Sequence, residues 1–281
     1  MDSCRICGEF EFTEKSTKQF AGFRSTWVEC TRCKVQRIYP YPTPEELVRY
    51  YNDRYLSKQC SGSVSHLKRF SANYKPTVFH EYSLTFSDVG VRVGDLLGAR
   101  ILDFGCADGI FLDWLTSLGA STQNLFGIDL SAEMVGCAAE KGYQAVTFEK
   151  RHELFNHKFD FICLWDVLEH VSNPRDTIAE LTGVMRQGTQ VLIQTPMLGL
   201  LSDRLGEQFE HYLPFEHLHL FPRQALLDVF ESAGFSHLKS TSFGANAPSE
   251  IVPHPYKQVY DSLAKLTDNG ATQVALFQWE G

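Results

Sequence analysis

The sequence predicts an α/β fold, in which helices cover both faces of a doubly wound, mostly parallel sheet and a small N-terminal module precedes it. From residue 99 onward, short apolar runs alternate with segments of helical periodicity, a pattern typical of parallel strands joined by helical crossovers. Apolar residues make up 43% of the chain, enough for a packed core. A polar, serine-rich stretch interrupts the pattern at 57–75. We therefore expect a module at 1–56, a linker or lid at 57–75 and the main domain at 76–281.

The main domain contains a regular series of expected elements. Five strands are expected, over residues 99–104, 124–130, 143–148, 159–165 and 189–195. Three helices are expected between them, over residues 110–119, 131–142 and 173–188. In the last helix, Asn173 can act as the cap, Pro174 can occupy the first turn and Gly188 can follow the end. A further helix and two late strands indicate an antiparallel edge, over residues 221–234, 235–243 and 272–279.

Two C-x-x-C pairs near the N-terminus predict a metal site. They are Cys4 with Cys7, and Cys30 with Cys33. Each pair directs two thiolates to one point, and two pairs complete the tetrahedron that Zn²⁺ prefers. A redox role fits less well, because there are two pairs and neither begins the helix of a βαβ unit. Since a site closed by four sulfurs is structural, we expect one structural zinc ion in a zinc-ribbon module.

The remainder of the N-terminal part is helical in its pattern and basic in its charge. Thr43 can cap a helix from Pro44 to Tyr55, with Glu46 completing a capping box. Residues 1–75 carry 13 Lys and Arg against 8 Asp and Glu, although the whole chain has a net charge of −8. Two interpretations stay open: the module docks on an acidic domain, or it holds an anionic group of the substrate.

A glycine-rich turn follows the first expected strand of the main domain. Asp103, Gly105, Ala107 and Gly109 lie between a buried strand and a helix start, where backbone N–H groups can approach a ligand. Asp129 ends the next strand, where a carboxylate can accept hydrogen bonds from ribose hydroxyls. NAD is the weaker candidate, because the G-x-G-x-x-G spacing is not present here. Taken singly, these residues could also form only a tight turn and a helix cap.

The ordered series DFGCADG, GIDLS and FDFICLWDVLEHVSNP, followed by a strand ending in TP, resembles the class I S-adenosylmethionine-dependent methyltransferases. The resemblance covers residues 76–281 and implies a seven-stranded sheet with a reversed last hairpin. It implies that S-adenosylmethionine lies across the carboxyl ends of the first two strands. The cofactor-binding residues it implies are Asp103, Gly105, Ala107 and Gly109 at the methionine moiety, Asp129 at the ribose, Leu130 at the adenine, and Asp166 after the fourth strand. The family often has glycine where Ala107 stands.

The N-terminal part resembles the module carried by a subgroup of bacterial methyltransferases. The resemblance rests on the paired cysteines, the segment YPYPTPEEL and the segment YYNDRY. That subgroup is associated with sugar, polysaccharide and secondary-metabolite pathways. The resemblance therefore implies a small-molecule acceptor such as a sugar, a nucleotide-sugar or a related metabolite.

The insertion after the fifth strand contains several histidines, among them His211, His217 and His219. A metal site there would fit only if they lay on a strand, so we expect a proton-transfer or substrate-binding loop. In the sugar C-methyltransferases of the subgroup this region has a Tyr-x-Glu-His pattern. Here Glu216 and His217 keep the Glu-His step and the tyrosine is lost, so O-, N- and C-methylation all stay open. We expect His217, oriented by Glu216, to be the general base, with His170 as a second candidate that could equally buttress the next helix.

Two other functions are compatible with these patterns. One is an RNA methyltransferase with a zinc-ribbon recognition module, which the basic N-terminal part favours and the acidic total argues against. The other is a binding protein that keeps the fold without catalysis, which an intact glycine-rich turn argues against. Neither a signal peptide nor a membrane span is expected, and thiols without disulfides indicate the cytoplasm. We expect a small-molecule substrate and no nucleic-acid or membrane partner, and the sequence leaves the oligomeric state open.

Overall fold

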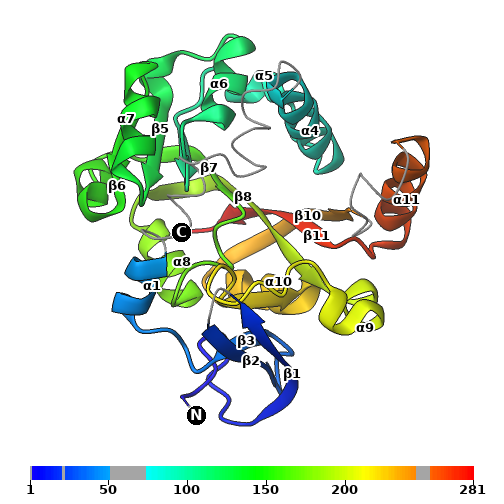
Figure 1. Ribbon diagram of the computed structural model, residues 1–281. Coiled ribbons are helices and arrows are strands. Elements are labelled where there is room, and N and C mark those ends of the chain that lie inside the picture. Colours follow the sequence, from blue (N-terminus) through cyan, green and yellow to red (C-terminus); the bar gives the residue numbers. More distant parts are fainter. Residues whose placement is uncertain (1, 21–22, 51–73, 245–253) are drawn as a thin grey trace.

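The computed structural model describes residues 2–20, 23–50, 74–244 and 254–281. A twisted central sheet runs through the molecule, with helices on both of its faces and the N-terminal strands at one end (Figure 1). The expected lid at 57–75 lies outside the described residues up to 73, and a helix begins at Tyr74. Among the described residues, no helix is long and apolar enough to cross a membrane.

The main sheet has the mostly parallel order that the sequence predicts. Its parallel strands lie in the order β6-β5-β4-β7-β8, and two further strands follow, with β11 antiparallel to both β8 and β10. The bounds are β4 (Ile101–Phe104), β5 (Leu125–Asp129), β6 (Gln144–Thr147), β7 (Phe159–Trp165), β8 (Met185–Leu198), β10 (Phe235–Phe243) and β11 (Thr272–Trp279). All seven coincide with expected strands to within a few residues. The crossover order brings the carboxyl ends of β4, β5 and β7 to one edge of the sheet.

The expectation of a seven-stranded sheet is wrong, because the sheet has eleven strands. The four additional strands are β1 (Phe12–Phe20), β2 (Phe23–Cys30), β3 (Gln36–Tyr39) and β9 (His219–Pro222). β8 continues past the end of β7, and Met197 and Leu198 pair with β9. β9 in turn pairs with β3 of the N-terminal module. The extension of β8 leaves backbone N–H and C=O groups that need partners, and the insertion and the module supply them.

Helices cover both faces of the sheet, and each face has its own apolar core. One core lies under α4, α6 and α7 and includes Phe86, Phe111 and Trp114. The opposite core lies under α8 and α10 and includes Ile178 and Phe230. The helices are α1 (Pro44–Tyr50), α4 (Tyr74–Asp88), α5 (Val93–Leu96), α6 (Ile110–Ser117), α7 (Ala132–Glu140), α8 (Pro174–Thr182), α9 (Leu200–Leu205), α10 (Arg223–Glu231) and α11 (His254–Thr267), with 3₁₀ turns η2 (Thr122–Asn124), η3 (Phe148–Leu154) and η4 (Gly206–Gln208).

One expected helix end differs in the structure, and another lies outside the described residues. The helix predicted over 173–188 stops at Thr182, and Gly188 lies inside β8 instead of following the helix. Met185 is buried and pairs with Phe159 of β7, so strand pairing replaces the last helical turns. The capping box at Thr43 is present, with Glu46 N donating to Thr43 Oγ1 at 3.2 Å. That helix, α1, is described to Tyr50, and its expected end at Tyr55 lies outside the described residues.

Candidate active site

The glycine-rich turn after β4 needs glycine at both predicted positions. Gly105 has a φ of +91° and Gly109 a φ of +82°, a region that L side chains rarely adopt. A Cβ at Gly105 would also lie 2.4 Å from Cγ2 of Val167, which is too close for any side chain. Ala107, between them, has a φ of +47°. The turn therefore brings the backbone after β4 close to the segment that follows β7.

Asp129 holds this turn from the end of β5. Its Oδ2 accepts a hydrogen bond from the Ala107 N–H at 2.8 Å, and its Oδ1 accepts one from the Ser131 N–H at 2.9 Å. The helix cap that was the alternative role of Asp129 is made instead by Ser131, whose hydroxyl accepts from Met134 N. Leu130, the neighbouring candidate, is 64% exposed. Asp129 and Leu130 thus flank the turn, at the edge of the sheet where a nucleoside is expected.

Asp103 is a buried carboxylate beneath the same turn. Its side chain is 2% exposed, and Oδ1 has no hydrogen-bond partner among the described residues. Burial raises the pKa of Asp103 well above its ordinary value, and the nearby Asp129 carboxylate raises it further. A cationic group bound above the turn would satisfy this oxygen and restore its charge.

The segment after β7 carries three further polar side chains. Asp166 is exposed, has a φ of +52° and accepts a hydrogen bond at Oδ2 from Gln194 Nε2 at 2.9 Å. Glu169 is fully buried and accepts from Thr195 Oγ1 at Oε2, 2.9 Å away. Its Oε1 has no hydrogen-bond partner among the described residues and lies 3.9 Å from Nε2 of His170. Burial raises the pKa of Glu169 to about 7. Glu169 follows the fourth expected strand with Asp166 and His170, where the family places residues that face the cofactor and substrate, but it was not among the predicted catalytic residues.

His170 and His217 meet beside Glu169. Their ring centroids lie 5.0 Å apart, and one donor atom from each of these three residues lies within 4.8 Å of the others. His170 Nδ1 donates to the Glu216 carbonyl, and His217 Nδ1 donates to the His211 carbonyl at 2.7 Å, an assignment of the tautomers that follows from these acceptors. Nε2 of each ring then carries the lone pair. Burial lowers the pKa of both histidines, so both are neutral near pH 7.

This geometry changes the role expected for Glu216. The acceptor at His217 Nδ1 is the His211 carbonyl, and Glu216 contributes its backbone carbonyl to His170. The sequence predicted His217 as a general base oriented by the adjacent carboxylate, whereas in the structure a backbone carbonyl accepts the hydrogen bond at its Nδ1. A backbone acceptor six residues earlier leaves no sequence pattern, because any residue type can supply it.

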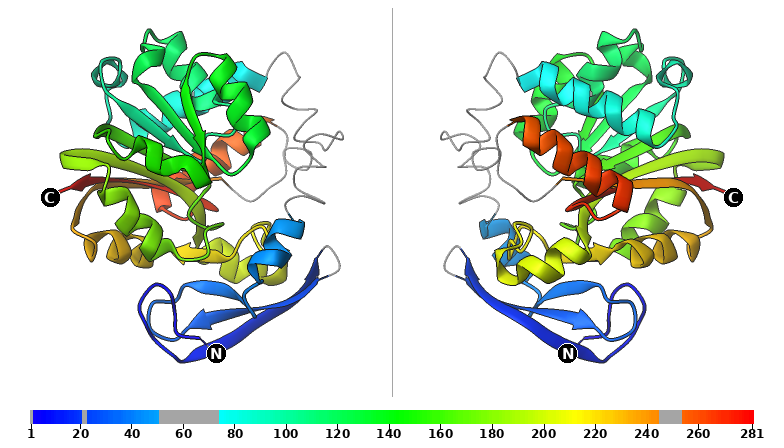
Figure 2. Two further views of the ribbon diagram at one scale, coloured as in Figure 1. Left: turned by 90° about the vertical axis from the view of Figure 1, so that its left-hand side faces the viewer. Right: turned by 90° about the vertical axis from the view of Figure 1, so that its right-hand side faces the viewer.

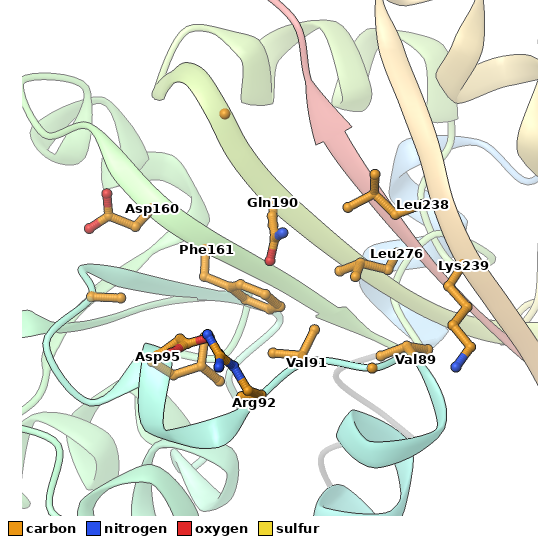
Figure 3. A pocket seen from close by; sticks show the side chains of 14 residues that line it. Val89, Val91, Arg92, Asp95, Asp160, Phe161, Gln190, Leu238, Lys239 and Leu276 are labelled. Atoms are coloured by element: carbon orange, nitrogen blue, oxygen red, sulfur yellow. The ribbon is translucent and has the colours of Figure 1, made fainter.

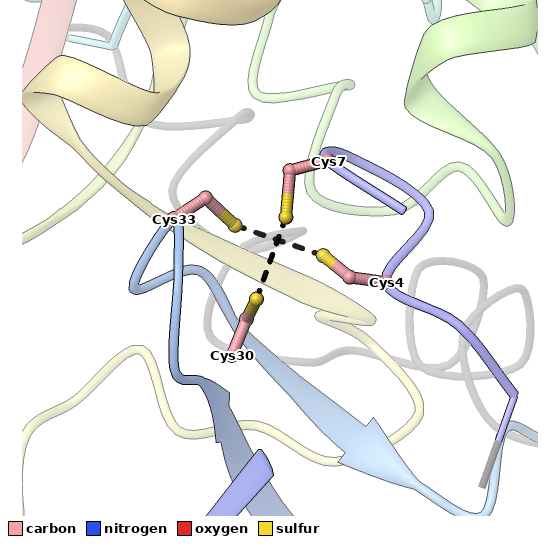
Figure 4. A group of neighbouring side chains, drawn as sticks. All are labelled: Cys4, Cys7, Cys30 and Cys33. Carbon is pink, nitrogen blue, oxygen red and sulfur yellow. Dashed lines mark hydrogen bonds between the residues drawn. The ribbon is translucent and has the colours of Figure 1, made fainter. Parts of the chain in front are cut away.

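The four cysteines that were predicted to bind a metal also lie close together, at the Cys30 end of strand β2. Cys30 ends β2, Cys33 follows it in the turn before β3, and Cys4 and Cys7 come from the first loop (Figure 4). The Sγ atoms of Cys4 and Cys33 are 3.6 Å apart, those of Cys7 and Cys30 are 3.5 Å apart, and all four lie within 4.8 Å of one another. A tetrahedral zinc ion with bonds of about 2.3 Å needs sulfurs about 3.8 Å apart. The thiols fit such an ion.

The chain matches a family described as "Methyltransferase domain" over residues 77–240. With the sheet order and the turn described above, this match decides the family. The chain belongs to the class I S-adenosylmethionine-dependent methyltransferases. It is similar to the ubiquinone biosynthesis O-methyltransferase of Aeromonas salmonicida (strain A449), with 32% identity over 112 residues that cover 37% of this chain and 46% of the relative.

A second curated relative and a solved structure are also similar to this chain. The protein of the same name from Aromatoleum aromaticum is 32% identical over 133 residues, covering 44% of this chain and 55% of that one. The chain thus spans about half the length of the curated relatives it matches. The structure of magnesium protoporphyrin IX methyltransferase from Synechocystis PCC 6803 with bound SAH has a TM-score of 0.51 at 18% identity, covering 84% of this chain and 99% of the other. That likeness shows the fold.

A cavity of about 370 Å³ lies elsewhere on this methyltransferase, at the amino end of β7. Its lining includes Val89, Arg92, Asp160, Gln190 and Lys239 (Figure 3). None of the predicted site residues lines it. Because the turn, Asp129 and the histidines lie at the carboxyl ends of the strands, this cavity belongs to the opposite edge of the sheet.

The buried Glu169 makes the stability of this methyltransferase depend on pH. Its folded pKa of about 7 lies above the ordinary 4.5, so the folded state favours the protonated acid, and the penalty for ionisation grows as pH rises from 4.5 to 7. We expect the free energy of unfolding of the wild type, relative to Glu169→Gln, to fall by about 3 kcal/mol over this range and then to level off. Urea unfolding at a series of pH values measures it.

The exposed Glu153 provides the matched control for that series. Glu153→Gln should give a curve parallel to the wild type. A Glu169→Gln curve that is also parallel to the wild type would show that Glu169 titrates normally.

Proposed function

We propose that this chain transfers the methyl group of S-adenosylmethionine to a small-molecule acceptor, such as a sugar, a nucleotide-sugar or a related metabolite. The observation that carries the proposal is the meeting of two groups of residues at one edge of the sheet. One is the glycine-rich turn with Asp103 and Asp129, and the other is the histidine pair beside Glu169. The named O-methyltransferase relatives support a small-molecule acceptor. The resemblance of the N-terminal sequence to the module of the sugar-pathway subgroup supports the sugar class.

The cofactor would be held by the residues around the turn. Gly105, Ala107 and Gly109 leave room for its methionine part, and the unpartnered oxygen of Asp103 suits its ammonium group. Asp129 would accept from the ribose hydroxyls, Leu130 would cover the adenine, and Asp166 would face the site from the end of β7. When bound, the cofactor supplies an electrophilic methyl group on a sulfonium. The fixed backbone of the turn would aim that group toward the histidines, and alignment of this kind is worth up to about 7–11 kcal/mol of the barrier.

His217 would act on the acceptor. Its Nδ1–H is bound to a carbonyl, so Nε2 could take the proton from an acceptor hydroxyl while the acceptor oxygen bonds to the methyl carbon and the bond from that carbon to the sulfonium sulfur breaks, its electron pair staying on sulfur. A neutral ring near pH 7 is the form that a base requires. His170, 5.0 Å away between ring centroids and tied to the Glu216 carbonyl, would bind the acceptor or pass on the proton. Glu169 would stabilise the positive charge that develops on this pair.

We further propose that Cys4, Cys7, Cys30 and Cys33 hold one structural Zn²⁺. The sulfur separations support a tetrahedral ion, and four thiolates leave no open position for chemistry. The chain would then consist of a zinc module at 1–56, a linker or lid at 57–75 and a catalytic domain at 76–281. A reducing compartment such as the cytoplasm would keep these thiols available for the metal.

Calorimetric titration with S-adenosylmethionine tests the proposed function. The wild type should bind it, and Asp129→Ala should weaken binding by about 1–3 kcal/mol, because two hydroxyls lose a charged acceptor and the turn loses its tie at Ala107. Asp228→Ala, which changes an exposed carboxylate on α10, should bind like the wild type. Tight binding of NADH with no response to S-adenosylmethionine would contradict the proposal.

A further inference from the structure

The N-terminal module is hydrogen-bonded to the strand that follows His217. β3 pairs antiparallel with β9, placing Arg37 opposite His219, and the Ile38 N–H donates to the Leu218 carbonyl at 3.2 Å. In both views of Figure 2, the N-terminal strands (blue) lie beside the yellow part of the chain that carries β9. The backbone immediately after the proposed base is therefore fixed by residues that are distant from it in the sequence, since Arg37 and His219 are 182 positions apart.

Tyr41 adds a side-chain contact at the same place. Its hydroxyl lies 2.7 Å from Nε2 of His219, whose side chain is buried. Burial, together with the positive charges of Arg5 and Arg37, lowers the pKa of His219 to about 3. The ring is neutral near pH 7 and accepts the hydroxyl hydrogen at Nε2. The contact with Tyr41 thus fixes His219, two residues from His217, in the segment of residues 213–220.

Arg5 makes a corresponding contact to residues 167–172, the segment that carries His170. It lies between Cys4 and Cys7, and its guanidinium donates to the Ser172 carbonyl at 2.6 Å. The same guanidinium lies 3.8 Å from the centre of the Tyr41 ring, at cation–π distance. Ser172 is two residues after His170, so the loop that carries the first cysteine pair is tied beside that histidine as well.

The two histidine segments, residues 167–172 and 213–220, are also bound to each other. The Glu169 carbonyl accepts from the Leu218 N–H at 2.7 Å and from the His219 N–H at 3.1 Å. His170 Nδ1 donates to the Glu216 carbonyl. These bonds fix the separation of the segments, and the module contacts both of them from one side.

We propose that the N-terminal cysteine module is a clamp that sets the relative position of His170 and His217, with Tyr41 and Arg5 as its positioning residues. This inference rests on the proposed function, because the position of the two histidines matters only if they act on the acceptor. The contacts that fix this position can be tested without measuring turnover. Neither residue touches the glycine-rich turn, so the clamp acts on the acceptor side of the site. Metal binding by the four cysteines would order the loop that carries Arg5 and so maintain the contact to Ser172.

Hydrogen exchange followed by mass spectrometry, on the full chain with its metal, tests the clamp. Tyr41→Phe removes one hydroxyl, so we expect exchange in residues 213–220 to become about three- to tenfold faster. Arg5→Met should have the same effect in residues 167–172. Exchange in residues 101–130 should stay the same in both variants. The affinity for S-adenosylmethionine should stay within about twofold, because an independent, distant site is unaffected.

Two substitutions within the module serve as matched controls. Thr17→Val removes a hydroxyl bonded to Thr26 inside the β1–β2 hairpin, and Arg32→Met changes the exposed arginine of the second cysteine pair. Neither should alter exchange in the two histidine segments. In Tyr41→Phe, the ¹⁵N resonance of His219 Nε2 should also shift, which a general loss of stability would not produce selectively.

Unchanged exchange in both segments with Tyr41→Phe and Arg5→Met would overturn the clamp. An equal acceleration of hydrogen exchange in residues 101–130 would also overturn the clamp, because the module would then stabilise the whole domain and not the two histidine segments in particular. A wild type that fails to bind S-adenosylmethionine would remove the proposed function and leave this comparison intact, so the two failures are distinguishable.

Discussion

Purified protein is expected to contain about one zinc per chain, and Cys30→Ser should lose it together with the fold of the N-terminal strands. The binding free energy of a four-thiolate site, about 10–16 kcal/mol in small zinc modules, contributes directly to folding. The module depends on it, because its own apolar residues are few and its buried side chains, such as Trp27 and Ile38, pack mainly against the insertion. Elemental analysis gives the metal content, and calorimetric melting gives the loss of stability.

Cys137→Ser is the control for this experiment, since Cys137 is exposed on α7. It should keep the zinc and the melting temperature of the wild type. Metal-free wild-type protein that melts at the same temperature as the loaded protein would rule out a structural zinc ion.

Replacing His217 with glutamine should lower turnover by at least tenfold, and by about 10²–10⁴-fold if it is the only base, while the affinity for S-adenosylmethionine stays nearly constant. Glutamine keeps a hydrogen-bonding side chain but cannot take up a proton. The reason for the separation of effects is spatial: His217 lies with His170 and Glu169, whereas the proposed cofactor contacts are at the turn after β4. Steady-state kinetics with an accepted substrate and calorimetry with the cofactor measure the two quantities.

The pH dependence of turnover provides a second check on His217. Burial holds its pKa well below the ordinary 6.5, so the ring is already in its basic form at pH 6 and the rate should not fall there for lack of base. His152→Gln, an exposed substitution, should behave as the wild type. Normal turnover by His217→Gln would transfer the catalytic assignment to His170, and an unfolded variant would withdraw the evidence for His217.

Much of the main domain could be predicted because its signals are local. The seven predicted strands and the glycine-rich turn are encoded by apolar runs and by positions that need a positive φ, such as Gly105. The spacing within each cysteine pair likewise brings two thiols together locally, and the hairpin of β1 and β2 brings the two pairs to one point. The carboxyl ends of β4, β5 and β7 meet because parallel strands joined by crossovers leave no other arrangement.

The parts that the sequence missed depend on contacts between distant residues. The sequence predicts that Gly188 follows the end of a helix, yet pairing of Met185 with Phe159 places it in a strand. Glu169 reads as a polar residue near a strand end, and only the packing around it makes it fully buried with a raised pKa.

The sequence by itself predicted the class of fold and the set of cysteines that meet, since each depends on residue type and short spacing, and the place of the cofactor site stays a prediction of the same kind. Only the tertiary structure decided that the sheet has eleven strands and that Tyr41 reaches His219. It also replaced Glu216 by the His211 carbonyl as the acceptor for His217. The physical reason is the same in these cases. Unpaired strand edges and backbone carbonyls accept any partner of suitable geometry, so the choice of partner is made by packing and leaves no pattern in the sequence.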